Sequence, residues 1–246
     1  MEWVDQGIVV SARKHGESSL IVTLLTKEHG RHAGLIKGGS SRRNSGLYEP
    51  GNLLSIEWRA RLPEHLGSIK GELKKAYSAE ALGDAMALTG LSAACAMVDS
   101  LLPEREPHGP VYDGLLTLLN MLGEPAWPSL YVRWELGLLS ELGFGLDLSA
   151  CAASGSTENL IYVSPKTGRA VSDVAGEAYK DRLLALPPFL LGGSKAVPDR
   201  AHILNGLALT AYFLEESIFR PQAKEIPASR TRFVDRVKRM DTISGA

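Results

Sequence analysis

The chain has 246 residues, of which 44% are hydrophobic, so it can bury a full core in one or two domains. It contains no apolar run of the roughly 18 residues that a membrane-spanning helix needs, and its first residues, MEWVDQG, lack the charged start and apolar centre of a secretory signal. Two cysteines, Cys95 and Cys151, make no disulfide framework, so we expect a cytoplasmic protein in a reducing compartment.

Charge is distributed unevenly along the chain, although 27 basic and 28 acidic residues give a formal net charge of −1. Residues 1–79 carry 12 Lys and Arg against 8 Asp and Glu, together with four of the six histidines. Residues 80–216 carry 8 against 17, and residues 217–246 carry 7 against 3. This asymmetry indicates a basic binding module joined to a more acidic body, although each charge taken singly also fits an ordinary solvated surface.

Short segments rich in β-branched residues, separated by glycine, proline or basic residues, occupy the first part of the chain. They span residues 6–12, 20–26, 30–37, 52–59 and 66–70. Five strands at this spacing predict a small, closed or nearly closed barrel in a domain of residues 1–78. An OB-type barrel is the usual five-stranded solution and binds nucleic acid across one face and its flanking loops, but periodicity alone does not separate it from an SH3-like barrel.

The stretch from residue 24 to residue 50 is the strongest candidate for a nucleic-acid contact. Its glycine- and serine-rich loop is too polar to pack a core, whereas arginines and exposed backbone N–H groups hold phosphates. Only Glu28 and Glu49 oppose its cations, which are Lys27, Arg31, Lys37, Arg42 and Arg43. We predict that phosphates contact Arg31, Lys37, Arg42 and Arg43 there, and Arg59, Arg61 and Lys70 on the later strands.

Base stacking by the barrel would need aromatic side chains on its surface. Trp58 and Tyr48 are the candidates. A core role is favoured for Trp58, because its strand must also fill the barrel.

Helical spacing begins after Tyr77, so residues 79–246 are predicted to form an α-helical domain. The predicted helices span residues 79–102, 110–122, 128–142, 176–186, 198–219 and 229–240. An irregular segment, residues 143–175, interrupts them, and its centre is typical of a small hairpin that turns at residues 165–168. Cys95 lies in an apolar run of the first of these helices and is predicted to be a core residue.

The last predicted helix has an apolar stripe with a basic flank. Its apolar residues are Phe233, Val237 and Met240, and its cations are Arg230, Arg232, Arg236, Lys238 and Arg239. Such a helix extends a nucleic-acid path, above all through Arg230 and Arg232, or holds an acidic peptide. The alternative is an ordinary terminal helix whose cations lie near the negative end of its dipole, and both interpretations stay open.

The sequence contains none of the common catalytic motifs. It lacks G-x-S-x-G, H-E-x-x-H and G-x-x-x-x-G-K-[ST], so we predict neither an enzyme nor a cofactor. An unrecognised site that pairs Ser18 or Ser40 with His15 or His32 would lack a third partner. His29 and His32 flank a glycine in a β-turn context, so we expect both to face solvent rather than to bind a metal.

Five strings stand in a fixed order along the chain. They are GIVVSARKHGESSLIVTLLTKEHGR, KGGSSRRNSGLYEP, LGSIK, RWELGLLSELGFGLDLSACAASG and the SRTRF of residues 229–233. In this order they resemble the bacterial recombination mediator family RecO over nearly the whole chain. The resemblance implies an α+β fold, in which an N-terminal five-stranded OB barrel precedes an α-helical domain with a small irregular knob, and no enzymatic turnover.

The resemblance also implies a role in DNA repair and recombination at the nucleoid. Members of this family bind single- and double-stranded DNA, anneal complementary strands coated with single-strand-binding protein, and work with RecR to help load RecA. The acidic, phenylalanine-ended tail of single-strand-binding protein docks on the helical domain of such proteins, where Arg133 of the R-W-E string is a candidate contact. The alternative is an OB-fold RNA-binding protein without a recombination role, which would ignore this tail.

Many members of that family bind zinc through two C-x-x-C pairs in the irregular segment. The matching positions in this chain are Cys151, Ser154, Ser172 and Ala175, so one thiolate of four remains. Because a tetrahedral structural site needs four donors, we predict no zinc, with hydrogen bonds and packing in place of the metal.

Overall fold

The computed structural model describes residues 1–240 except residues 43, 45, 63 and 193–196. Its elements group into two compact units, Met1–Gly123 with Pro227–Phe233, and Glu124–Ile226 with Val234–Ala246. A spatial grouping does not decide which segments fold independently, so the division between residues 78 and 79 stays a prediction. In the part of the chain that is described, no helix is long and apolar enough to cross a membrane.

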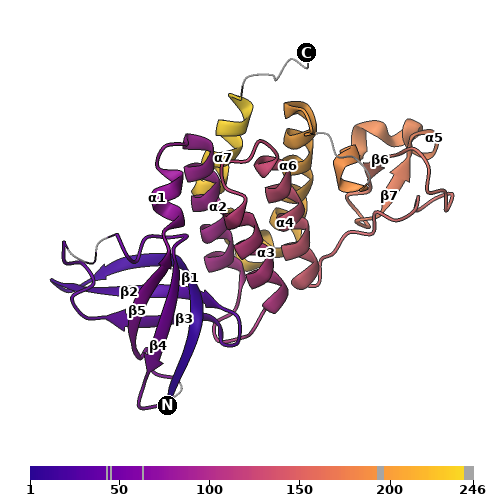
Figure 1. Cartoon of the computed structure of the whole chain (residues 1–246). Helices are drawn as coiled ribbons and strands as arrows, with labels where there is room; N and C mark the ends of the chain where they lie inside the picture. The colour runs from indigo at the N-terminus through magenta and orange to yellow at the C-terminus, as the bar shows by residue number, and fades with distance from the viewer. Residues whose placement is uncertain (43, 45, 63, 193–196, 241–246) are drawn as a thin grey trace. The chain divides into compact units, whose positions relative to one another are not determined.

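Five strands close into a barrel in the first unit (Figure 1). They are β1 (Glu2–His15), β2 (Ser19–Thr26), β3 (Gly30–Ile36), β4 (Leu53–Arg59) and β5 (Ser68–Lys75). The long β1 pairs with two strands, because its first half lies against β4 and its second half against β2. A parallel contact between Leu35 of β3 and Ser68 of β5 completes the order β1-β2-β3-β5-β4. The five-stranded OB prediction is confirmed.

Two strands are longer than the sequence pattern predicts. β1 begins at Glu2 rather than at residue 6, because Trp3 pairs with Trp58 across the ladder between β1 and β4. β5 continues to Lys75 rather than ending at Lys70, since a strand with a solvated face tolerates polar residues there. Backbone pairing therefore extends both strands into polar sequence.

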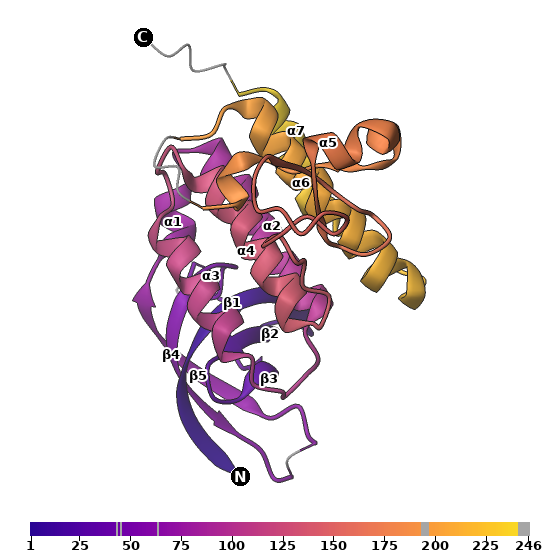
Figure 2. The same ribbon diagram turned by 90° about the vertical axis from the view of Figure 1, so that its right-hand side faces the viewer.

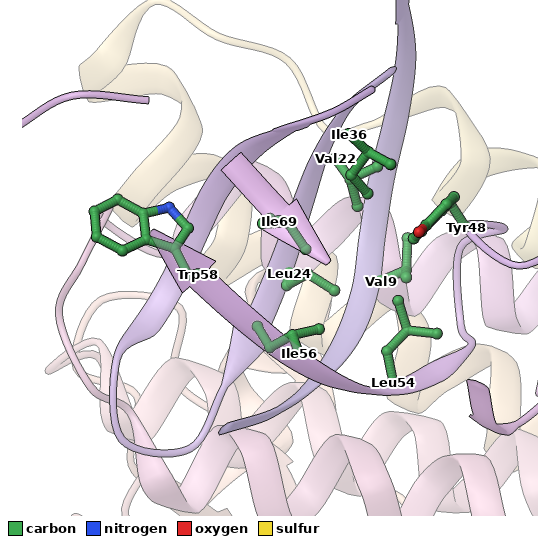
Figure 3. Close-up of a cluster of buried hydrophobic side chains, with 9 residues drawn as sticks. All are labelled: Val9, Val22, Leu24, Ile36, Tyr48, Leu54, Ile56, Trp58 and Ile69. Carbon is green, nitrogen blue, oxygen red and sulfur yellow. The ribbon is translucent and has the colours of Figure 1, made fainter. Parts of the chain in front are cut away.

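The barrel interior is filled by side chains from alternate strand positions (Figure 3). The buried set is Val9, Val22, Leu24, Ile36, Tyr48, Leu54, Ile56, Trp58 and Ile69. Trp58 donates its indole N–H to the carbonyls of Ala33 (3.3 Å) and Leu66 (3.2 Å), which satisfies its polar atom. The core role favoured for Trp58 is confirmed. Tyr48 belongs to the same core, so the loop between β3 and β4 does contribute to packing, contrary to expectation.

Three helices follow the barrel in the first unit, α1 (Tyr77–Ala81), α2 (Ala85–Leu101) and α3 (Gly109–Asn120). The single helix predicted over residues 79–102 is divided, because Asp84 caps a new helix by accepting a bond from the Met86 N–H at 2.7 Å. Cys95 is buried, with Sγ 3.6 Å from the Val9 carbonyl oxygen, and burial raises the pKa of its thiol to about 12. Its predicted core role is confirmed.

The segment after α2 lies against the start of β3. The Arg105 N–H donates to the Arg31 carbonyl at 2.8 Å. A Cβ on Gly30 would lie 2.0 Å from the Glu106 carbonyl oxygen, and the φ of Gly30 is +65°. Glycine at this position therefore allows both the turn and the close approach of the two segments.

The second unit contains α4 (Trp127–Glu141) and α6 (Arg200–Leu214), which pack side by side (Figures 1 and 2). Their approach is close at Gly206, where an added Cβ would lie 2.8 Å from Val132 Cγ1. The Thr210 hydroxyl donates to the carboxylate of the fully buried Glu135 at 2.6 Å. A π-helical turn, Glu215–Phe219, continues α6, and α7 (Ala228–Lys238) is the last helix of the described chain.

The irregular segment forms a small sheet in which β6 (Leu160–Val163) lies between β7 (Ala170–Ser172) and β8 (Leu184–Ala185). The antiparallel pair β6–β7 confirms the predicted hairpin. The helix predicted over residues 176–186 is wrong. Instead, the short α5 (Asp173–Gly176) leads into a 3₁₀ turn, Glu177–Arg182, and the next residues leave helical geometry to pair with β6.

Three of the four positions that match zinc-binding cysteines meet in this knob. Cys151 is buried, and its Sγ accepts bonds from the N–H (3.3 Å) and the hydroxyl (3.4 Å) of Ser172. Hydrogen bonds from Ser154 and Ser172 lower the pKa of the Cys151 thiol to about 6, against the opposing effect of burial. Hydrogen bonds thus join Cys151 to Ser172, and the absence of zinc stays a prediction.

Candidate nucleic-acid interface

The ends of β1, β2 and β3 meet at one edge of the barrel. In the antiparallel registers His15 pairs with Ser19, and Leu20 pairs with Ile36. Residues that adjoin these pairs are neighbours in space although they are distant in sequence. We use the name basic edge for the exposed basic side chains of this region: Arg13, Lys14, His15, Lys37 and Arg42.

Hydrogen bonds hold the loop that follows β3 at this edge. The Ser40 N–H donates to the Ser18 carbonyl at 3.1 Å, which joins the loop to the turn between β1 and β2. Within the loop, Asn44 donates through Nδ2 to the Gly38 carbonyl at 3.2 Å. Because Tyr48 further anchors the loop in the barrel core, the described part of the loop presents Lys37 and Arg42 from a fixed support.

The structure places two of the predicted phosphate contacts on the basic edge. Lys37 and Arg42 are exposed, and Arg42 also interacts within the chain. Arg43 lies outside the described residues. Sequence reasoning missed Arg13 and Lys14, because a basic pair inside a strand gains meaning only when the register brings the strand end beside the loop.

Arg31 is held by groups of its own unit. Its Nε donates to the Leu102 carbonyl at 2.8 Å, its Nη1 lies 3.2 Å from the Asp99 carboxylate, and its Nη2 lies 3.6 Å from that of Glu104. Only 17% of its side-chain surface is exposed. These contacts favour a structural role at the carboxyl end of α2, and the DNA contact of Arg31 stays a prediction.

Arg59 and Lys70 lie on neighbouring strands and both face solvent. Arg59 forms ion pairs with Glu2 (2.6 Å) and Glu57 (3.2 Å), and the bond with Glu2 raises the pKa of its guanidinium. Lys70 pairs with Glu57 in the register of β4 and β5. Arg61 follows β4 and is exposed. Nearby carboxylates therefore offset part of the positive charge on this side of the barrel.

The predicted helical contacts differ in accessibility. Arg230 is buried and interacts within the chain, whereas Arg232, on the same helix, is exposed. The Arg133 guanidinium donates to the Phe189 carbonyl at 2.6 Å and lies 5.9 Å from the centre of the Phe189 ring. The binding roles of these three arginines stay predictions.

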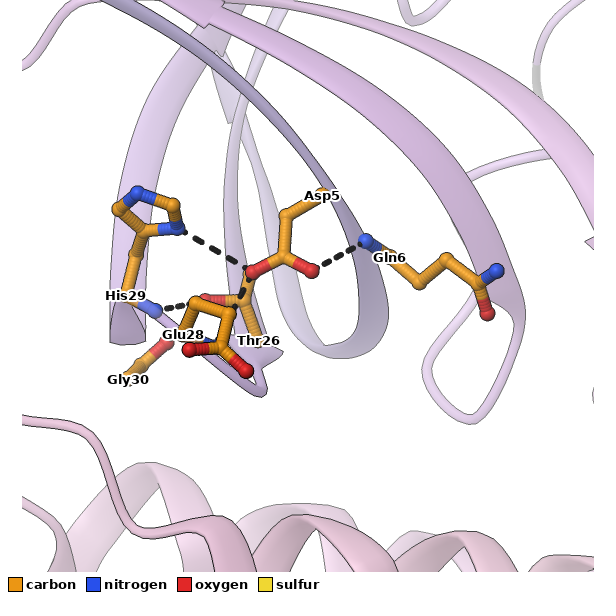
Figure 4. A network of polar contacts seen from close by, with 6 residues as sticks. All are labelled: Asp5, Gln6, Thr26, Glu28, His29 and Gly30. Atoms are coloured by element: carbon orange, nitrogen blue, oxygen red, sulfur yellow. Dashed lines mark hydrogen bonds and ion pairs between the residues drawn. The ribbon is translucent and has the colours of Figure 1, made fainter.

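A polar network surrounds Asp5 of β1 (Figure 4). The Asp5 carboxylate accepts bonds from the N–H groups of Gln6 (2.7 Å) and Glu28 (3.2 Å), and lies 3.2 Å from Nδ1 of His29. The His29 N–H also donates to the Thr26 hydroxyl oxygen at 3.1 Å. This network fixes the turn between β2 and β3 against β1 and orients the His29 ring.

Four aromatic rings gather beside this network. His29 stacks on Trp3 with ring centroids 3.9 Å apart and planes 6° apart, and Trp3 lies parallel to Trp58 with centroids 5.5 Å apart. His32 meets both indoles edge-on, at 5.1 and 4.8 Å. The rings line a pocket of about 390 Å³, which we call the aromatic pocket; its remaining lining residues are Met1, Glu2, Glu28 and Arg105.

His32 is 6% exposed, so the expectation that it faces solvent is wrong. Alternate residues of β3 point into the barrel, and His32 falls in the inward series. Burial, with a further effect of the nearby Arg105 charge, lowers its pKa to about 4. Neither ring nitrogen has a hydrogen-bond partner among the described residues. His29 is half-buried and bonded to Asp5.

Two family models together match most of the chain. The model described as "Recombination protein O N terminal" matches residues 1–77, which include the whole barrel. The model described as "Recombination protein O C terminal" matches residues 82–225.

Several curated relatives align along nearly their full length, and each has the name "DNA repair protein RecO". The protein of Rhodospirillum centenum is 53% identical over 100% of this chain and 98% of its own. That of Rhodospirillum rubrum is 47% identical over 97% of both chains. That of Methylorubrum populi is 47% identical over 95% of this chain and 97% of its own.

Proposed function

The chain belongs to the RecO family of DNA repair proteins, and from this premise we propose that it is a non-enzymatic recombination mediator. In this proposal it binds single- and double-stranded DNA and anneals complementary strands coated with single-strand-binding protein. Together with RecR it assists the loading of RecA, in the cytoplasm at the nucleoid and without a cofactor. No described feature favours the alternative of an RNA-binding protein over this one.

The basic edge is the observation that supports DNA binding most directly. Lys37, Arg42, Arg13 and Lys14 are exposed at the end of an OB barrel, where a passing phosphate backbone meets several cations together. Contacts with phosphates fix a strand without reading its sequence. An annealing protein needs this property, because it must hold strands of any sequence and leave their pairing edges free.

Docking of the acidic tail is proposed for the second unit. A terminal carboxylate beside an aromatic ring requires a cation next to an apolar surface. Arg133 offers this combination, since its guanidinium lies beside the Phe189 ring. Arg236 and Lys238 of α7, which belong to the same unit, are the other candidates.

The decisive experiment measures annealing of complementary oligonucleotides precoated with single-strand-binding protein. We expect rapid annealing by the wild type, slower annealing by Lys37→Ala/Arg42→Ala, and little annealing when the coat protein lacks its tail. The matched control is Lys166→Ala/Arg182→Ala, which removes two exposed cations from the knob and should anneal as the wild type does.

Two results would count against the proposal. Failure of the folded wild type to anneal, combined with tight binding to structured RNA, would support the RNA-binding alternative. Annealing that the control variant weakens as much as the Lys37→Ala/Arg42→Ala variant would remove DNA from the basic edge and leave only a general effect of charge.

A further inference from the structure

The aromatic pocket lies apart from the basic edge in the barrel. Its lining comes from the start of β1, the turn between β2 and β3, the body of β3, the end of β4 and the segment after α2. At about 390 Å³ it is within the size range of pockets that hold small organic molecules or single heteroaromatic groups. The ring set therefore surrounds a space large enough for a ligand.

The geometry of the rings favours a flat occupant. The planes of Trp3 and His29 differ by 6°, and those of Trp3 and Trp58 by 15°. Because His29 already covers one face of Trp3 at 3.9 Å, a planar ring that enters the pocket would stack on a face that this pair leaves open. A cage for an ammonium group instead needs ring faces that enclose a cation, whereas Trp3 and His29 lie face to face with each other.

The charges of the lining residues favour a nucleobase over a phosphate as the occupant of the pocket. Glu2 and Glu28 line the pocket together with Arg105, so the interior does not favour an anion. Carboxylate oxygens do accept hydrogen bonds from the exocyclic amino groups of cytosine and adenine. An uncharged heteroaromatic ring with amino groups matches both properties.

Three cations belong to the lining of the pocket or to the chain segments next to it. Arg59 bonds to Glu2 of the lining and keeps 60% of its side-chain surface exposed. Arg61 follows in the chain and is exposed, and Arg105 reaches the same loop by donating to the Glu64 carbonyl at 3.1 Å. Glu2 and Glu57 offset part of the charge of Arg59, so Arg61 and Arg105 are the main candidates to meet the phosphates of a nucleotide whose base enters the pocket.

We propose that the aromatic pocket receives an unpaired nucleobase of single-stranded DNA, stacked parallel to the rings of Trp3 and His29. The inference rests on the proposed DNA binding and extends it from phosphate contacts to a base contact. Duplex DNA, whose bases are stacked internally, gains nothing from the pocket. Binding of single strands therefore has a component that charge alone does not supply.

The test compares two oligonucleotides of equal length and charge, one with cytosine bases and one abasic throughout. Stacking of a base on an aromatic side chain changes affinity by about five-fold or more, so we expect the wild type to bind the oligonucleotide with bases at least that much more tightly. Trp3→Ala should abolish this ratio, and His29→Ala should reduce it. Trp3→Phe, which retains an aromatic face, should keep most of it.

Circular dichroism identifies any variant that fails to fold. If Trp3→Ala does not fold, the two single variants Trp3→Phe and His29→Ala decide whether a base stacks in the pocket. Equal affinity of the wild type for both oligonucleotides would overturn the base pocket while leaving DNA binding intact. An unchanged ratio in the folded Trp3→Ala variant would overturn it as well, by locating the base contact elsewhere. Absence of binding to either oligonucleotide would overturn both the pocket and the proposed function.

Discussion

Burial of His32 should make the free energy of unfolding of the barrel depend on pH in the acid range. Its folded-state pKa of about 4 lies below the ordinary value of 6.5, so the unfolded chain takes up a proton first as the pH falls. The free energy of unfolding should therefore decline from pH 6.5 to about pH 4 and then level off, by roughly 3 kcal/mol in total from this group. His32→Phe keeps the edge-on ring packing and should remove this part of the decline.

Denaturant unfolding at several pH values measures the effect. The control is His15→Phe, which makes the same substitution at an exposed histidine. An identical decline in the wild type and His32→Phe would show that other groups cause the acid sensitivity.

The same residue shows what the sequence could not predict at this scale. Gly30, which lies between His29 and His32 in the chain, correctly indicates a turn, but which face of β3 points inward depends on its partner strands. A shift of one position would expose His32 and bury Arg31 instead. The place of Trp3 is not predictable from the sequence for a related reason, since its pairing with Trp58 joins residues that lie far apart in the chain.

At the scale of the helices, two glycines lie in contrasting places, one at a tight contact between helices and one on an open surface. Gly206 of α6 faces α4, where a new Cβ would lie 2.8 Å from Val132, while Gly137 of α4 has nothing within 4 Å. Gly206→Ala should lower the free energy of unfolding by about 1–3 kcal/mol through overpacking. Gly137→Ala should raise it by about 0.5–1 kcal/mol, because alanine favours the helix.

Thermal or denaturant unfolding of both variants checks the contrast. The substitution is chemically the same, so opposite signs would isolate the contact between α4 and α6. Stabilisation by both substitutions would show that Val132 yields to the added methyl group.

The knob offers a test of metal dependence. The Sγ of Cys151 accepts two bonds from Ser172, so we expect a chelator to leave the melting temperature unchanged. Cys151→Ala should lower the free energy of unfolding by about 1–3 kcal/mol, because a buried N–H loses its acceptor. Metal analysis of the purified protein provides the check, and stoichiometric zinc together with a chelator-induced loss of stability would contradict the prediction.

Elements with strong local signals were predictable from the sequence, and those defined by distant partners were not. The proline at the start and the apolar period of α4 set its bounds to within a residue of those predicted. Residues 176–186 also contain helix-forming side chains, yet Leu184 and Ala185 pair with β6 and end the helix early. Pairing with another strand outweighs the weak local preference there.

At the scale of the whole molecule, the uneven charge was visible in the sequence but its organisation was not. The first 79 residues have a basic excess, and the register of the barrel collects part of it on one edge while Arg31 and Arg59 form ion pairs. A count of cations therefore overstates the number available to phosphates. Salt dependence gives a direct measure of that number, because each phosphate contact with single-stranded DNA releases counterions.

We expect the logarithm of the affinity for single-stranded DNA to fall linearly with the logarithm of salt concentration. If Lys37 and Arg42 each contact a phosphate, Lys37→Ala/Arg42→Ala should reduce the magnitude of the slope by about 1.4, at about 0.7 per contact. Lys166→Ala/Arg182→Ala makes the same change in net charge within the acidic part of the chain and should leave the slope unaltered. Equal reductions in both variants would mean that the field of the whole molecule, rather than the basic edge, governs binding, because only direct contacts distinguish two variants of identical net charge.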